Sequence, residues 1–147
     1  SRPHHLQRPK RHLERSRSKP AKLPEGKNSE HWHQATFVSV LRRINHPAAR
    51  WAHSSANGFL RAKSMRLRAW KEGCIAGTPD LFIPWPSNGR HGLFIEMKRN
   101  PNTPTPEQLA FLDAMREHGY EAHVCYDWQE ALNVFCAYVG ISIDLHF

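Results

Sequence analysis

The sequence predicts an α/β fold in which helices flank a mixed central sheet. Apolar residues recur at helical spacing in several segments, and short runs of strand-forming residues lie between those segments. The expected order along the chain is helix, strand, helix, strand, strand, helix, strand, helix. A length of 147 residues allows one hydrophobic core, so we expect a single globular domain.

We expect the domain to begin at Ser29, behind a disordered basic arm. Residues 1–28 contain nine Lys or Arg residues against Glu14 and Glu25. They have too few large apolar side chains to offset the entropy of ordering the segment. Such an arm either contacts nucleic acid without sequence preference or is a solvated tail, and the sequence leaves both interpretations open. Residues 29–147 would form the folded domain.

The first half of the domain is expected to hold a helix, a short strand and a second, basic helix. Apolar residues recur at helical spacing behind Ser29, a residue type that caps helices, so the first helix should run to about Arg43. The segment 50–54 follows as a short strand that closes at the turn signal Asn57-Gly58. Residues 60–72 predict a strongly basic helix that a glycine terminates.

The second half is expected to hold a hairpin, a helix, a strand and a closing helix. The apolar runs at residues 81–85 and 93–95 are rich in strand formers, so they should pair as a hairpin at the centre of the sheet. Pro106 lies near the start of a helix that a glycine stops. Residues 122–126 predict a further strand, after which Asp127 can cap the closing helix.

The net charge of +8 favours a polyanionic partner, since a basic surface releases the counterions of phosphates. Most of the excess lies in residues 1–28. Residues 42–71 form a second basic region with no Asp or Glu, whereas the chain from Thr105 onward has Arg116 alone against seven acids. We therefore expect one end of the domain to attract phosphate and the other not to.

Three cysteines lack any CxxC spacing, which argues against a disulfide framework and a structural zinc site. No apolar run approaches the roughly 20 residues of a membrane helix, and the basic start lacks the apolar stretch of a signal peptide. We therefore expect a soluble, cytoplasmic protein that is not secreted.

Charged residues gather where the two central strands are expected to meet. Residues two apart on a strand point to the same face, so Glu96 and Lys98 should project side by side while Met97 turns away. Asp80 begins the paired strand and approaches Glu96 if the hairpin register permits. Two carboxylates can hold Mg²⁺, with the Met97 carbonyl completing its inner shell, and Lys98 can orient an attacking water. The alternative is that Glu96 and Lys98 form only a surface ion pair.

Several motifs occur together in the chain: Gly77-Thr78-Pro79-Asp80-Leu81, Gly92-Leu93-Phe94-Ile95-Glu96-Met97-Lys98, Thr105-Pro106-Glu107-Gln108 and Gly119-Tyr120. In combination they resemble the VRR-NUC branch of the PD-(D/E)XK nucleases, over about residues 30–139. The resemblance implies a restriction-endonuclease-like core and cleavage of DNA with Mg²⁺ or Mn²⁺. For a small stand-alone member, of the kind that bacteriophages often encode, the resemblance implies a homodimer that acts on branched DNA such as Holliday junctions. Larger relatives cut flaps and trim ends.

The resemblance also implies roles for single residues. Asp80 and Glu96 match the metal carboxylates of the family, and Lys98 matches its catalytic lysine. Glu30, with Gln34 one helical turn later as a possible support, resembles the acid of the first helix, which would bind the metal directly or through water. A glutamate in the first turn of a helix is otherwise only a partner of the helix dipole.

The basic helix at residues 60–72 resembles the region that lies near DNA in such folds. Arg61, Lys63 and Arg66 are the expected phosphate contacts, and Gln108 matches a glutamine that we expect to contact DNA. The alternatives are a solvated helix face and a solvent-facing Gln108. Four tryptophans could stack on bases, but their spacing within apolar runs favours core or dimer packing: Trp51, Trp70, Trp85 and Trp128.

Three functional classes follow from the sequence. The first is a metal-dependent DNA endonuclease that selects branched DNA or, alternatively, processes flaps or ends. The second is a non-catalytic DNA-binding module with the same fold. The third is a basic protein whose arm binds RNA or protein. The intact set of Asp80, Glu96 and Lys98 favours the first, because a binding module gains nothing from carboxylates that repel DNA.

Overall fold

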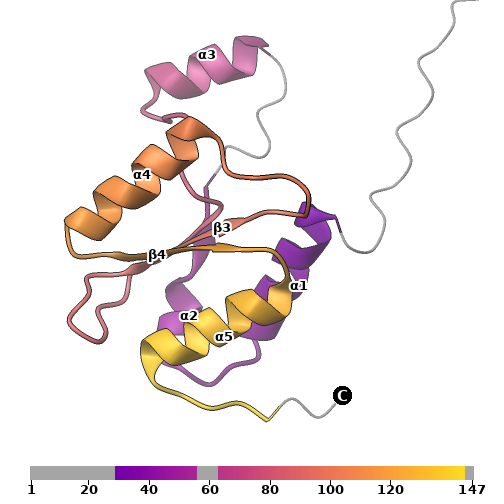
Figure 1. The fold of residues 1–147 in the computed structure, drawn as a ribbon, viewed down its shortest axis with the longest axis vertical. Helices are drawn as coiled ribbons and strands as arrows, with labels where there is room; N and C mark the ends of the chain where they lie inside the picture. Colours follow the sequence, from indigo (N-terminus) through magenta and orange to yellow (C-terminus); the bar gives the residue numbers. More distant parts are fainter. Residues whose placement is uncertain (1–28, 56–62, 145–147) are drawn as a thin grey trace, which may run out of the picture.

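The computed structural model describes residues 29–55 and 63–144. The strands are β1 (His53–Ser54), β2 (Leu81–Ile83), β3 (Leu93–Met97) and β4 (Glu121–Cys125). The helices are α1 (Glu30–Leu41), α2 (Pro47–Trp51), α3 (Lys63–Lys71), α4 (Pro106–Glu117) and α5 (Trp128–Val139). The strands form one sheet in the order β1-β2-β3-β4, with α4 on one side and α1 and α5 on the other (Figure 1). This arrangement confirms the predicted fold class.

The centre of the sheet is the predicted hairpin of β2 and β3. The two strands are antiparallel, with Leu81 opposite Ile95 and Ile83 opposite Leu93. Strand β4 pairs parallel to β3, because the chain crosses through α4 before it returns to the sheet. The sheet is therefore mixed, as the order of elements predicted.

Strand β3 has both faces covered, so all of its residues are buried. Leu93, Ile95 and Met97 belong to the main core, which also holds residues of α1 and α5. Phe94 belongs to a smaller cluster with residues of α4 and β4. Because side chains alternate along a strand, Glu96 points to the same face as Phe94, toward α4.

Helix ends follow the capping residues that the sequence indicated. The Ser29 hydroxyl accepts a hydrogen bond from the Trp32 backbone N–H at 3.0 Å at the start of α1. The Asp127 carboxylate accepts one from the Glu130 backbone N–H at 2.7 Å at the start of α5. Within the part of the chain that the structure describes, no helix is long and apolar enough to span a membrane.

A short helix, α2, replaces much of the strand predicted at residues 50–54. The His46 imidazole caps this helix by accepting a hydrogen bond from the Ala48 backbone N–H at 3.1 Å, and Pro47 occupies its first turn. Proline is favoured there because its missing N–H would have no helical partner. The strand prediction is wrong for Arg50 and Trp51, and only the last two residues of the segment form β1.

Helix α3 is the predicted basic helix, and it projects from the rest of the fold (Figure 1). Ala69 is its one buried residue, whereas Met65, Leu67 and Trp70 are exposed. Three sequence predictions lie outside the described residues: the basic arm at residues 1–28, the turn at Asn57-Gly58 and the phosphate contact of Arg61.

The packing of α4 against the sheet gives a test of the fold. Both Leu112 and Leu109 belong to α4. Leu112 is 0% exposed, whereas Leu109 is 45% exposed. Replacing a buried leucine by alanine costs about 2 to 5 kcal/mol, so we expect Leu112→Ala to lower the free energy of unfolding by that amount. Leu109→Ala should cost less than about 1 kcal/mol. Urea denaturation followed by circular dichroism measures both, and equal losses would contradict this packing.

Candidate active site

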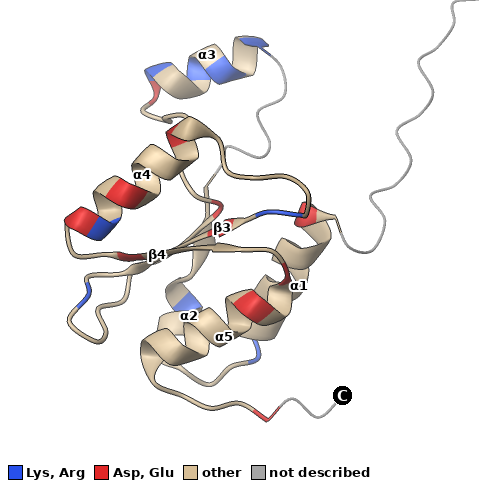
Figure 2. Cartoon of the chain, in the orientation of Figure 1, with Lys and Arg blue, Asp and Glu red and all other residues tan. Residues whose placement is uncertain are grey.

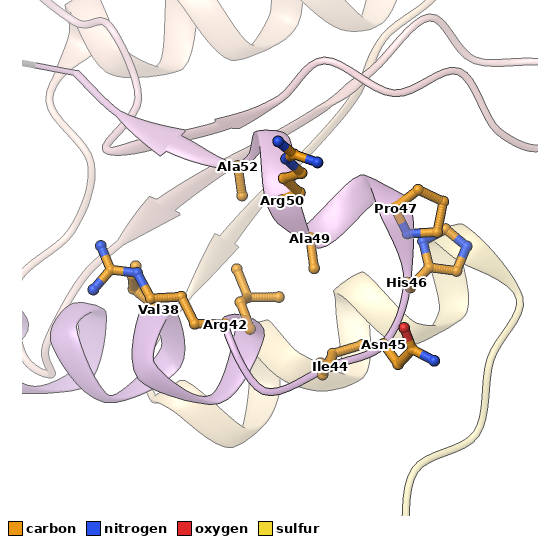
Figure 3. Close-up of a pocket in the computed structure, with 10 residues that line it drawn as sticks. Val38, Arg42, Ile44, Asn45, His46, Pro47, Ala49, Arg50 and Ala52 are labelled. Carbon is orange, nitrogen blue, oxygen red and sulfur yellow. The ribbon is translucent and has the colours of Figure 1, made fainter.

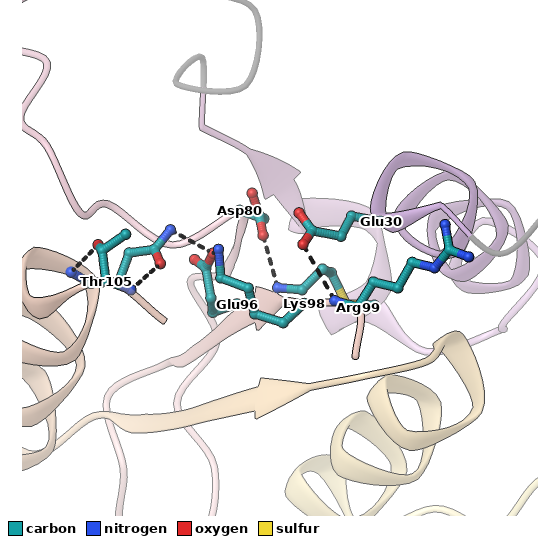
Figure 4. Close-up of polar contacts among 8 residues, drawn as sticks. Glu30, Asp80, Glu96, Lys98, Arg99 and Thr105 are labelled. Atoms are coloured by element: carbon teal, nitrogen blue, oxygen red, sulfur yellow. Dashed lines mark hydrogen bonds and ion pairs between the residues drawn. The ribbon is translucent and has the colours of Figure 1, made fainter. Parts of the chain in front are cut away.

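Two carboxylates lie close together beside the central hairpin (Figure 4). Asp80 directly precedes β2, and Glu96 lies near the end of β3. The Asp80 carboxylate accepts a hydrogen bond from the Met97 backbone N–H at 2.7 Å. Its backbone carbonyl accepts another from the Ser55 N–H at 3.0 Å. Both the side chain and the backbone of Asp80 are therefore fixed by neighbouring strands.

The turn before Asp80 packs directly against the start of α4. Gly77 has a φ of +88°, and a β-carbon at this position would clash with the backbone of Glu107. Only glycine fits both the conformation and the space. Pro79, which follows two residues later, is fully buried. The turn thus holds Asp80 at a defined distance from α4 as well as from β3.

Lys98 completes the charged group. Its Nζ lies 3.6 Å from Glu96 Oε1, and its side chain is 12% exposed. The Lys98 backbone N–H donates to the Cys125 carbonyl at 2.9 Å, which extends the pairing of β3 with β4. The structure therefore brings Asp80, Glu96 and Lys98 together. Since Glu96 is only 2% exposed, the pair of Glu96 and Lys98 is not a surface ion pair.

Gln108 contacts Glu96, and its expected contact with DNA stays a prediction. Its amide Nε2 donates to Glu96 Oε1 at 2.8 Å. Its amide oxygen accepts from the Thr105 backbone N–H at 2.9 Å, and the Thr105 hydroxyl accepts from the Gln108 N–H at 3.2 Å. Both the oxygen and the nitrogen of the Gln108 amide therefore make hydrogen bonds within the chain, and the amide orients the Glu96 carboxylate.

Glu30 lies at the edge of the group rather than within it. Its carboxylate accepts a hydrogen bond from the Arg99 backbone N–H at 3.3 Å, and its charge helps to raise the pKa of Asp80. Within residues 29–55 and 63–144, no three His, Cys, Asp or Glu side chains form a metal-binding cluster. The role of Glu30 as a metal ligand, directly or through water, therefore stays a prediction. Gln34 is half-buried one turn further along α1.

Burial dominates the electrostatics of the two carboxylates. Burial, followed by the negative charge of Asp80, raises the pKa of Glu96 to about 8, although Lys98 acts in the opposite direction. Burial also raises the pKa of Asp80, against the hydrogen bond from Met97. The Lys98 ammonium therefore does not offset the cost of ionising both carboxylates at this site.

One oxygen of Glu96 has the surroundings expected of a metal ligand. Glu96 Oε2 is buried, and no donor in the described residues reaches it. An unpartnered buried carboxylate oxygen is unfavourable unless a proton or a metal cation binds it. Carboxylate oxygens are also the ligands that Mg²⁺ and Mn²⁺ prefer. Asp80 and Glu96 thus fit a hard divalent cation in both charge and donor type.

These residues border a hollow of about 420 Å³, which we call the site hollow. One part of its wall consists of Glu30, Asp80, Glu96, Lys98 and Gln108. The other part comes from α3 and the segment that follows it, including Arg66, Trp70, Cys74 and Ile75. The site hollow therefore lies between the charged group and the projecting basic helix.

A larger hollow of about 600 Å³ lies between the end of α1 and α2 (Figure 3). Its wall contains Arg42, Arg50 and His46 but no carboxylate. It has no paired acids to hold a metal and no positioned nucleophile. We therefore do not take it as the candidate site, although it is larger than the site hollow. The chemistry points to the site hollow.

The basic residues expected to contact phosphate occupy different positions. Arg66 lines the site hollow. Lys63 is exposed at the first residue of α3, outside the lining. Figure 2 shows positive charges on α3 and also on α2, which lies across the molecule from α3, and acidic residues along α4. The basic residues of the described chain are therefore not gathered at one end of the domain.

The sequence analysis missed Trp70 as a residue of the site. Trp85 and Trp128 pack against the main core, but core packing is wrong for Trp51 and Trp70, which are 53% and 66% exposed. Trp70 also lines the site hollow. Its spacing of four residues from Arg66 places both on one face of a helix, and that spacing is the signal that could have identified it.

Comparison with known proteins agrees with this geometry. The sequence profile of the VRR-NUC domain matches residues 25–128, from before α1 to the start of α5. The chain belongs to the VRR-NUC domain family. VRR-NUC domains are nuclease domains, so the chain is a member of a nuclease family.

A solved structure described as a VRR_NUC domain protein resembles this VRR-NUC chain in fold. The two are 24% identical and superpose with a TM-score of 0.67, over 81% of this chain and 93% of the other. No curated protein matches the chain significantly.

The raised pKa of Glu96 predicts how the stability of the metal-free protein depends on pH. The folded state, with a pKa of about 8, binds more protons than the unfolded state above the ordinary value of 4.5. The free energy of unfolding should therefore fall as pH rises through this window. In Glu96→Gln this side chain no longer titrates. The free energy of unfolding of Glu96→Gln minus that of the wild type should therefore rise by a few kcal/mol from about pH 5 to about pH 8.

Thermal denaturation of both proteins in EDTA measures this difference. The comparison cancels the titration of groups that the two proteins share. A difference that stays constant across the pH range would show that Glu96 titrates normally.

Proposed function

We propose that this VRR-NUC chain is a Mg²⁺- or Mn²⁺-dependent deoxyribonuclease that hydrolyses phosphodiester bonds in branched DNA. The main support is the close approach of Asp80 to the buried Glu96, with one Glu96 oxygen that no donor in the described residues reaches and the Lys98 ammonium 3.6 Å from the other. A module that only binds DNA has no physical reason to hold two carboxylates together beside a basic helix. Membership of a nuclease family points the same way.

Asp80, Glu96 and the Met97 carbonyl would hold the divalent cation. When bound, the cation stabilises the negative charge that develops on the phosphate during hydrolysis. Gln108 keeps the Glu96 carboxylate oriented, because the start of α4 fixes its own amide. The Met97 N–H does the same for Asp80. The chain thus supplies two oriented carboxylates before any substrate arrives.

Lys98 acts on the water rather than on the affinity for DNA. Its ammonium is mostly buried beside Glu96, where its positive charge can orient the attacking water and lower the pKa of that water. Glu30 would contribute through a water molecule. Arg66, which lines the same hollow, is placed to contact a phosphate and position the strand without reading its sequence.

The preference for branched DNA and the homodimer rest on the resemblance to small stand-alone VRR-NUC proteins. A homodimer would present two sites to the two strands of a junction. The chemistry of one site requires only a phosphodiester, a divalent cation and the residues named above.

The proposal predicts metal-dependent cutting that needs Lys98. Labelled four-way junction, flap and linear duplex DNA should be incubated with Mg²⁺, Mn²⁺ or EDTA. We expect the wild type to cut the junction in either metal and to cut nothing in EDTA. Lys98→Ala should lower the rate by at least about a hundredfold, as is usual for loss of a group that acts on proton transfer, with DNA affinity nearly unchanged.

Arg99→Ala is the matched control, since it removes one positive charge at the next position from an exposed side chain. It should cut at nearly the wild-type rate. Binding of all three substrates without cutting of any would favour the DNA-binding module. Preferential cutting of the flap would favour a flap or end-processing nuclease, and equal activity of Lys98→Ala and wild type would contradict the mechanism.

A further inference from the structure

The wall of the site hollow has two chemically different parts. The carboxylates and Lys98 form a charged part, which suffices to bind a cation and a phosphate. Opposite them, Trp70, Cys74 and Ile75 form a largely apolar part. Phosphate and metal make no use of an apolar surface, so this part is suited to another portion of the substrate. In a nucleic acid, the adjoining apolar portion is the face of a base.

The Trp70 side chain is exposed to solvent and is not packed in the core. It is 66% exposed although it is a large aromatic residue, and the helix that carries it buries only Ala69. Arg66 precedes it by one helical turn and lines the same hollow. A basic side chain beside an exposed aromatic ring is the combination by which proteins hold the backbone and a base of an unpaired strand.

We propose that Trp70 stacks on an unpaired base next to the phosphate that is cut, and thereby selects DNA that is opened at this point. The inference rests on the proposed nuclease function and deepens it. Inside an intact duplex, both faces of each base are covered by neighbouring bases, so a ring can stack only after paying for unstacking. Flaps, single-stranded ends and opened branch points already expose such a face.

A second copy of the chain is the competing partner for this surface. Met65, Leu67 and Trp70 are all exposed on α3, and such residues could pack in a dimer. However, α3 also carries Lys63, Arg66, Arg68 and Lys71, and a symmetric contact between two copies of α3 would bring these charges together. The same charges favour a polyanion (Figure 2). Unpaired DNA is therefore the occupant that agrees with both charge and position.

The test compares Trp70→Ala and Trp70→Phe with the wild type. Trp51→Ala is the matched control, because Trp51 is similarly exposed but does not line the site hollow. Cleavage in Mg²⁺ is measured on a duplex with a single-stranded flap and on a linear duplex of the same length. Affinity for a labelled single-stranded thymidine oligonucleotide is measured by fluorescence anisotropy in Ca²⁺.

Stacking on one aromatic side chain accounts for about 5- to 150-fold in affinity for a base. We expect Trp70→Ala to lower oligonucleotide affinity and flap cleavage by at least about tenfold, while linear-duplex cleavage changes little. Trp70→Phe should restore most of the loss, because it keeps a ring that can stack. Trp51→Ala should resemble the wild type on all substrates.

Other outcomes would overturn the inference. Equal losses on the flap and the linear duplex, or no rescue by phenylalanine, would show that Trp70 does not recognise an unpaired base. A change from dimer to monomer in both Trp70→Ala and Leu67→Ala, measured by light scattering, would assign the surface to a second copy. If the wild type cuts no substrate, the proposed nuclease function fails. If the wild type cuts and Trp70→Ala still prefers the flap over the linear duplex, only the stacking proposal fails.

Discussion

The carboxylates of Asp80 and Glu96 are held close together, with Glu96 almost fully removed from water, and much of the surrounding structure serves to keep them there. Burial, followed by the negative charge of Asp80, raises the pKa of Glu96 to about 8, because a carboxylate that loses water beside a like charge is costly to ionise. A flexible pair would separate. The hairpin register, the Met97 N–H and the Gln108 amide each oppose that separation.

Helix α4 links the stability of the fold to the geometry of the site. The capping contact between Thr105 and Gln108 satisfies backbone groups at the start of the helix, and the same Gln108 side chain reaches Glu96. Gly77 packs the Asp80 turn against that helix start. The start of α4 therefore positions both carboxylates, one through a side chain and the other through the backbone. Trp70 and Arg66 face them from a helix that is not part of this packed unit.

Local signals in the sequence were sufficient for most elements and for the central charged group. Capping residues placed α1 and α5, and alternation along β3 placed Glu96 beside Lys98. Three features could not be obtained in this way. Helix α2 depends on His46 acting as a cap, which is an uncommon choice, and the contact of Gln108 with Glu96 depends on how α4 packs over the sheet. The exposure of Trp70 depends on α3 making little contact with the core, which no local pattern reveals.

The central claim is that Asp80 and Glu96 form an incomplete site that a divalent cation completes. Calorimetric titration of the full chain with Mn²⁺ tests it most directly, using wild type, Glu96→Gln and, as a control, Glu107→Gln at an exposed carboxylate of α4. The account predicts that wild type and Glu107→Gln bind Mn²⁺ with equal affinity and that Glu96→Gln loses this binding. Equal binding by all three proteins, or no binding by the wild type, would contradict it.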